Sequence, residues 1–160
     1  MTDIDHRAIT DTVCIVVYTI DTRLYGLFLN DVERLERAVK ITPLPGAPET
    51  ILGLVNVHGR FMPVVSTRRA LNLPGREVAP SDQFIIARIA KRMVILAVDS
   101  VKGVVERPKA EITARDEVIP GLENLRGVIK LDDNLILIHD LGRFLSSVEK
   151  EWIDEALENI

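Results

Sequence analysis

The stretch Ile51–Val65, which reads ILGLVNVHGRFMPVV, decides the fold of this chain. It contains two short apolar runs, Leu54–Val57 and Phe61–Val65, on either side of the turn residues His58-Gly59-Arg60. Short apolar runs that flank a glycine-containing turn are typical of a β-hairpin. We therefore expect two antiparallel strands at the centre of the sequence.

The same pattern recurs along all 160 residues, which include 18 Val and 17 Ile. Branching at Cβ favours the pleated, half-buried surface of a strand. Strand-length runs bounded by turn residues occur elsewhere at Val13–Ile20, Leu24–Leu29, Phe84–Ile89, Met93–Val98, Gly127–Leu131 and Leu135–His139. The sequence therefore predicts a mostly β protein built as a barrel or sandwich.

Composition excludes several classes of protein. With 47% hydrophobic residues the chain is not disordered, and a net charge of -4 argues against a dedicated nucleic-acid-binding protein. Charged residues interrupt the most apolar stretch, Phe84–Val98, so we expect no membrane insertion. A single cysteine, Cys14, and no signal-peptide pattern indicate a cytoplasmic protein.

The chain also contains an internal repeat. When Gly53 is aligned with Gly127, the hairpins that follow match, and Leu24–Leu29 matches Met93–Val98 at a slightly different offset. Any two hairpins can look alike, but four matched elements in the same order favour two related subdomains packed as one unit. We assign these halves to residues 12–74 and 82–147.

Outside the predicted strands, the sequence indicates a tail, a helix and two short helical turns. Residues 1–11 are polar and predict a flexible tail, whereas residues 148–160 carry an apolar stripe that predicts a C-terminal helix. Arg68–Asn72 and Gly142–Ser146 are interpreted as single helical turns. The segment Asp31–Lys40 is compatible with either a helix or an extended edge strand.

No constellation of residues supports catalysis or a cofactor. Cys14 lies within an apolar strand, and neighbours His139 and Asp140 would point to opposite faces of theirs. Together with Cys14, His6, His58 and His139 give no metal-ligand spacing, and there is no glycine-rich phosphate loop. An enzyme that uses His58 or His139 therefore remains only a minor alternative.

Two features indicate a binding surface instead. Pro43–Pro48 is a stiff connection with an apolar tip, although a crossover that closes a barrel is the favoured interpretation of this segment. The turn Asn56–Arg60 presents small and polar groups. Gly53 and Gly59 are expected to serve backbone geometry more than direct contact.

The stretch Ile51–Val65 resembles the signature of CheW-type chemotaxis coupling proteins, which reads roughly I-x-G-x-x-N-L-R-G-x-x-x-P-V-x-D-L-R. The similarity extends to Ile41–Pro48, Val98–Val101, Gly127–Asp133 and Leu135–Leu141, so it spans about residues 11 to 147 in the right order. Any one of these pieces is weak, but the series is specific.

The resemblance implies two related five-stranded SH3-like β-barrel subdomains and a non-catalytic adaptor without cofactors. Such an adaptor couples the cytoplasmic tips of methyl-accepting chemoreceptors to the regulatory domain of the histidine kinase CheA. It is monomeric when isolated and is recruited to receptor arrays at the inner membrane. On the receptor side the implied residues are Val32, Arg34, Leu35, Gly53, Asn56, Val57, His58 and Gly59. On the kinase side they are Leu44, Pro45 and Arg60.

The chain departs from the family pattern at three places. His58 replaces the Arg of N-L-R-G, Arg34 stands where an acidic residue is expected, and Ser66-Thr67 replaces Asp-Leu. Charge reversal on an interface changes specificity more readily than it changes the fold. We therefore expect a coupler specialised for a particular receptor set or for a non-flagellar chemosensory system, with a small-molecule-binding β domain as the alternative.

Overall fold

The computed structural model describes residues 11–89, 91–114 and 125–158. Most of the expected tail, residues 1–10, therefore lies outside the described residues, as do residues 159 and 160 of the expected helix. Strands dominate, as the sequence predicts. The elements are β1 Thr12–Ile20, β2 Arg23–Phe28, η1 Leu29–Asp31, β3 Val32–Arg37, β4 Ile51–Val57, β5 Arg60–Ser66, α2 Thr67–Ala70, β6 Gln83–Ile89, β7 Arg92–Val98, β8 Ser100–Pro108, η2 Lys109–Glu111, β9 Thr113–Ala114, β10 Leu125–Leu131, β11 Asn134–His139, η3 Leu141–Arg143 and α4 Ser147–Glu158.

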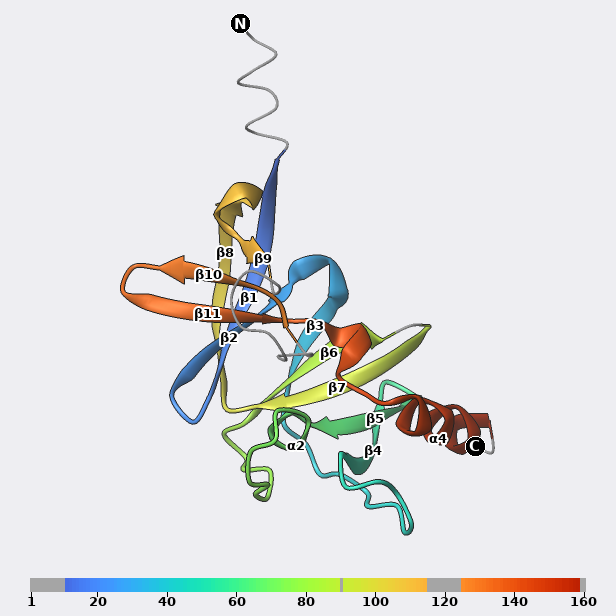
Figure 1. Ribbon diagram of the computed structural model, residues 1–160. Helices are drawn as coiled ribbons and strands as arrows, with labels where there is room; N and C mark the ends of the chain where they lie inside the picture. The colour runs from blue at the N-terminus through green and yellow to red at the C-terminus, as the bar shows by residue number, and fades with distance from the viewer. Residues whose placement is uncertain (1–10, 90, 115–124, 159–160) are drawn as a thin grey trace, which may run out of the picture.

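The strands form two sheets (Figure 1). The first sheet has six strands in the order β8-β1-β2-β11-β10-β9, and the second has five in the order β3-β6-β7-β5-β4. The extra strand of the first sheet is β9, which is only two residues long. Each sheet contains one parallel pair, β2 with β11 and β5 with β7, and its other pairs are antiparallel.

The two sheets do not follow the two halves of the sequence. Hairpin β1–β2 comes from the first half but joins strands β8 to β11, and hairpin β6–β7 comes from the second half but joins β3 to β5. The expected division into barrels at 12–74 and 82–147 is therefore wrong, because each sheet takes its central hairpin from the other half. A sequence repeat specifies similar strands but does not say which copies will pair.

The repeat itself is visible in the strand register. Leu35 lies opposite Ile85 in the second sheet, and Val104 lies opposite Val16 in the first. The alignment that equates Leu35 with Val104 also equates Ile85 with Val16. The exchanged hairpins thus occupy equivalent positions, and the two sheets are related as the sequence predicts.

Strands at the centre of the molecule bury both of their faces. In β6, Phe84 and Ile86 pack into a core of the second sheet, while Ile85, Ala87 and Ile89 pack into a central core that also contains residues of the first sheet. The alternation follows from the two-residue period of a strand. A third core lies within the first sheet and comprises Ile15, Val17, Ile129, Ile136 and Ile138.

Two edge strands complete the sheets. The segment Asp31–Lys40, for which helix and strand were both open, forms strand β3 after a short η1 turn. Its counterpart β8 has no strand prediction from the sequence, since Lys102, Gly103 and Glu106 interrupt its apolar residues. Both strands pair on one side only, and most of their exposed residues are charged or glycine, although Leu35 and Val104 are also exposed.

Helix α4 begins one residue earlier than expected and packs against the central core. Ser146 and Glu149 form a capping box, in which the Glu149 amide donates to Oγ of Ser146 and the Ser146 amide donates to Oε1 of Glu149. Ile153 is buried in the central core, with Trp152 and Leu157 packed beside it.

A polar network ties the two sheets together beside the central core. Arg68, on the turn after β5, donates to Oδ1 of Asp21 at 2.7 Å and to Oδ1 of Asp99 at 2.7 Å. Arg76 donates to Asp99 at 2.7 Å and to both oxygens of Asp82. Burial alone would raise the pKa of Asp99, but hydrogen bonds from the Asp21 amide and Arg68 hold it below its usual value. Asp21 belongs to the β1–β2 turn, so this network fixes the exchanged hairpin to the opposite sheet.

We predict that Arg68→Met destabilises the protein by about 2–3 kcal/mol, because two carboxylates lose a largely buried partner. The measurement is urea unfolding followed by circular dichroism. The neighbouring Arg69→Met is the matched control, since the Arg69 side chain is exposed, and it should change stability by less than about 0.5 kcal/mol. Equal effects of the two substitutions would show that the network contributes nothing.

Candidate docking surface

The turn between β4 and β5 presents the centre of the sequence motif to solvent. Its two central residues, His58 and Gly59, have φ values of 50° and 87°, which is the pattern of a type I′ hairpin turn. The Gly59 amide donates to Oδ1 of Asn56 at 2.8 Å and thereby closes the turn. The His58 side chain is 74% exposed, so the turn holds an accessible ring in a defined position.

An edge strand contributes two charged side chains to the same place. Arg34 and Glu36 lie two residues apart on β3, with Nε of Arg34 3.2 Å from Oε1 of Glu36. Nε2 of His58 lies 3.8 Å from the same carboxylate oxygen. We call these three residues the Arg34–Glu36–His58 cluster. It brings together two of the three places at which the chain departs from the family pattern, Arg34 and His58.

Sequence reasoning missed Glu36. The available signal was its spacing, because residues i and i+2 of an edge strand share a face and Arg34 had already been singled out. That signal depended on assigning Asp31–Lys40 to a strand, which the sequence left open.

The other residues expected on the receptor side divide into exposed and buried groups. Leu35 is 43% exposed, and Val32 is half-buried against the central core. Val57 is buried in the core of the second sheet and Gly53 is also buried, so neither presents a side chain to a partner. Their expected place on the docking surface is therefore corrected: they support the surface from beneath.

Gly53 is required by a close approach of two backbones. A Cβ atom at this position would lie 2.2 Å from the carbonyl oxygen of Thr42, and φ is +150°. Next to it, Thr42 and Leu54 exchange two hydrogen bonds, each 2.9 Å long. The connection that contains Pro43–Pro48 therefore closes against β4, as the crossover interpretation predicts.

The residues expected on the kinase side lie in two different elements. Leu44 and Pro45 belong to a turn in which Gly46 has a φ of 81° and the Ala47 amide donates to the Leu44 carbonyl oxygen. Pro45 is exposed and Leu44 is half-buried. Arg60 is exposed at the start of β5 and lines a cavity beside the β6–β7 turn.

His139 is a structural residue. Its Nδ1 lies 2.6 Å from the hydroxyl of Tyr18, and its ring stacks on Tyr25 with centroids 4.9 Å apart. Burial lowers the pKa of His139 to about 3, so the ring is neutral at physiological pH. Within the described residues, no three His, Cys, Asp or Glu side chains come together as potential metal ligands.

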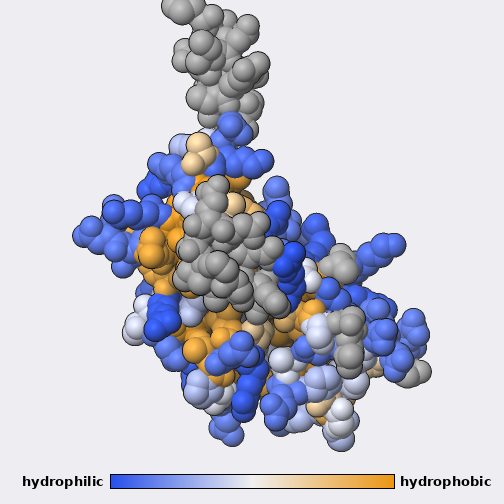
Figure 2. Space-filling view, in the orientation of Figure 1, coloured by the Kyte–Doolittle hydropathy of each residue, from blue (hydrophilic) through white to orange (hydrophobic). Residues whose placement is uncertain are grey.

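Polar and apolar residues are unevenly distributed on the face of the molecule that Figure 2 shows. In the space-filling view, hydrophilic residues lie around the periphery of the described residues, and hydrophobic ones are visible in the middle of this face (Figure 2). None of the helices described is long and apolar enough to cross a membrane.

Comparison with known families decides the identity of this fold. A family model described as "CheW-like domain" matches residues 15–149, which is most of the chain. The chain belongs to the CheW-like domain family. The sequence motif therefore identified the family correctly, and the β4–β5 turn described above is the motif's centre.

CheW proteins from several bacteria are similar to this chain over most of their length. The chemotaxis protein CheW of Rhizobium meliloti (strain 1021) is 28% identical over 69% of this chain and 72% of its own. That of Bacillus subtilis (strain 168) is 26% identical over 81% and 85%. The crystal structure of the scaffolding protein TtCheW from Thermoanaerobacter tengcongensis has a TM-score of 0.79 at 29% identity, covering 87% of this chain and 96% of that one.

These similarities confirm the expected fold, two related SH3-like β subdomains, and the expected class of function. They support the role of a chemotaxis coupling adaptor for this CheW-type chain.

Replacing Gly53 by alanine should destabilise the fold by about 3 kcal/mol or more, because the new methyl group meets a backbone oxygen that cannot move aside. Gly59→Ala is the matched control: its φ is +87°, but no atom lies within 4 Å of the added Cβ. It should cost only about 1 kcal/mol. Thermal and urea unfolding of the two variants measure the difference, and equal losses would contradict the close-approach argument.

His139 should make the protein less stable in acid. Its folded pKa lies below the unfolded value of 6.5, so the unfolded state binds more protons between about pH 6.5 and pH 3. Stability is therefore lost as pH falls below about 6.5, with a contribution of up to about 1.4 kcal/mol per pH unit. The measurement is the unfolding free energy of wild type and His139→Phe from pH 7 to about pH 4.5. The slope of this free energy against pH should differ between the two proteins by up to about 1.4 kcal/mol per pH unit, which corresponds to the uptake of one proton. Parallel curves would contradict a lowered pKa of His139 in the folded state.

Proposed function

We propose that this CheW-type protein couples the cytoplasmic tips of chemoreceptors to the regulatory domain of the histidine kinase CheA, as a cytoplasmic scaffold. The observation that carries the proposal is the CheW-like domain match over residues 15–149. In support, the motif's turn is exposed and held rigidly by the Asn56–Gly59 hydrogen bond. A scaffold needs rigid surfaces in fixed relative positions, and the role requires no catalytic group.

The receptor side of the proposal centres on the Arg34–Glu36–His58 cluster with Val32, Leu35 and the backbone of the β4–β5 turn. The His58 side chain is largely exposed and that of Arg34 is 43% exposed, and both lie within 4 Å of one carboxylate oxygen of Glu36. A partner that approaches this face meets Leu35 as an apolar contact with charged groups beside it. The kinase side is proposed at Leu44, Pro45 and Arg60, which lie outside this cluster.

The charges in the cluster are arranged differently from the family pattern. The pattern has an acidic residue at position 34 and a permanent cation at position 58, whereas this chain has a permanent cation at 34 and an imidazole at 58. Arg offers a planar fork of five donors, which a His ring cannot reproduce. We infer a coupler whose receptor presents an acidic group opposite Arg34, as in a specialised or non-flagellar chemosensory system.

The test measures affinity for two partners separately. The purified protein is titrated by isothermal calorimetry with a receptor-tip fragment and with the CheA regulatory domain from the same cell. The double substitution Arg34→Glu with His58→Arg restores the family pattern. It should weaken binding to the cognate receptor tip by about tenfold or more, while binding to the kinase domain stays unchanged.

The matched control is Arg37→Glu, a charge reversal at another exposed residue of β3. It should leave receptor binding nearly unchanged. If the wild type binds the tip normally and the double substitution has no effect, the cluster does not set specificity. If the wild type binds neither partner, the coupling function itself is wrong.

A further inference from the structure

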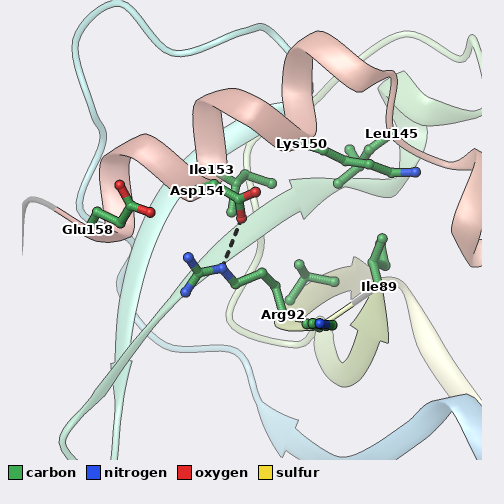
Figure 3. A pocket seen from close by; sticks show the side chains of 9 residues that line it. Ile89, Arg92, Leu145, Lys150, Ile153, Asp154 and Glu158 are labelled. Atoms are coloured by element: carbon green, nitrogen blue, oxygen red, sulfur yellow. Dashed lines mark hydrogen bonds and ion pairs between the residues drawn. The ribbon is translucent and has the colours of Figure 1, made fainter.

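A groove runs along helix α4 where it packs over the β6–β7 hairpin. Its larger part, about 600 Å³, is lined by apolar Ile89, Val94, Leu145 and Ile153 and by charged residues from both elements. In Figure 3, Asp154 and Ile153 point down from α4 toward Arg92, which rises from the hairpin. A smaller part, about 310 Å³, shares Lys91 and Arg92 with the larger one and is lined by Leu157 from the last turn of α4.

The smaller part of the groove is cationic. Arg60, Lys91 and Arg92 line it, together with Phe61, Met62, Met93 and Leu157, and none of the described residues that line it is acidic. Among the described residues, neither Arg60 nor Lys91 has an ion-pair partner within 4 Å. Because the protein as a whole carries a net charge of -4, this concentration of positive charge does not follow from its overall composition.

Arg92 is held in a position that leaves part of its guanidinium available. Its Nε donates to Oδ1 of Asp154 at 2.9 Å, and this bond fixes the side chain between the two parts of the groove. The two terminal nitrogens point away from Asp154 (Figure 3) and have no hydrogen-bond partner within the described part of the chain. Such a fixed fork is suited to a carboxylate.

An apolar contact lies directly beside these cations. Phe61 is 46% exposed, although large aromatic side chains are usually buried, and its neighbours Met62, Met93 and Leu157 form an adaptable apolar floor. Two cations with no ion-pair partner among the described residues, a fixed guanidinium fork and an exposed ring together match a ligand that has carboxylates next to an apolar side chain.

We propose that this groove is a docking site for an acidic segment of a protein partner, in which carboxylates flank a large apolar side chain. The carboxylates bind Arg60, Lys91 and the free side of Arg92, and the apolar side chain packs on Phe61 and Leu157. The groove includes Arg60, which the proposed function places on the kinase side. The inference goes beyond that function because it assigns an acidic ligand to the whole groove next to α4.

The experiment uses the full chain and a short fluorescein-labelled peptide in which Glu pairs flank Leu and Phe. A second peptide with Gln in place of every Glu is the ligand control. By fluorescence anisotropy, the acidic peptide should bind about tenfold more tightly than the Gln peptide, and added salt should weaken its binding. Equal binding of the two peptides would overturn the proposal.

Variants then locate the site. The double substitution Arg60→Glu with Lys91→Glu should reduce binding of the acidic peptide by about tenfold or more. The matched control, Lys102→Glu with Lys130→Glu, reverses two exposed charges of the other sheet and should retain binding. If both variants bind alike, the peptide binds elsewhere and the proposal fails. If the Arg60→Glu with Lys91→Glu variant folds poorly, Arg60→Gln with Lys91→Gln replaces it. This neutral variant should also bind the acidic peptide more weakly than wild type does.

Discussion

Burial of both faces of hairpins β1–β2 and β6–β7 is the constraint on which the rest of the structure depends. Each hairpin contributes one face to the core of its own sheet and the other to the central core, where side chains of both sheets and of α4 meet. Burying a large apolar side chain contributes roughly 1.5–3 kcal/mol. Because the central core draws on both sheets, neither sheet can bury its apolar residues alone, and the two subdomains form one rigid body.

That rigidity explains how a small protein can display functional groups on turns. The β4–β5 turn projects from strands that are anchored in a core, closed on one side by the approach of Thr42 to Gly53. The Arg34–Glu36–His58 cluster spans two elements that are far apart in sequence but fixed in relation to each other. Loops on a rigid scaffold commonly carry function, and here side-chain chemistry can change without a change in fold.

Strands and turns could be predicted from the sequence because they depend on local pattern. Apolar runs identified eight of the strands, but β8 was missed, since Lys102 and Gly103 break its pattern on an edge where only one side is paired. The exchange of hairpins could not be predicted: Leu24–Leu29 and Met93–Val98 resemble each other, so pattern alone does not choose between partners. Glu36 and the groove beside α4 were missed because they depend on tertiary proximity, whereas His58 and Arg34 stood out against the family motif.

The exchanged hairpins also determine when the chain can fold. Strand β1 pairs with β8, so that Val13 lies opposite Arg107, and β2 pairs with β11 near the end of the chain. Strands β8 and β11 lie on either side of hairpin β1–β2. During synthesis, the hairpin therefore cannot complete its pairing until the chain has been made as far as β11, which ends at His139. Contacts this distant in sequence slow folding and leave strand edges exposed meanwhile. The N-terminal hairpin is thus the segment for which a newly made chain most needs protection against aggregation.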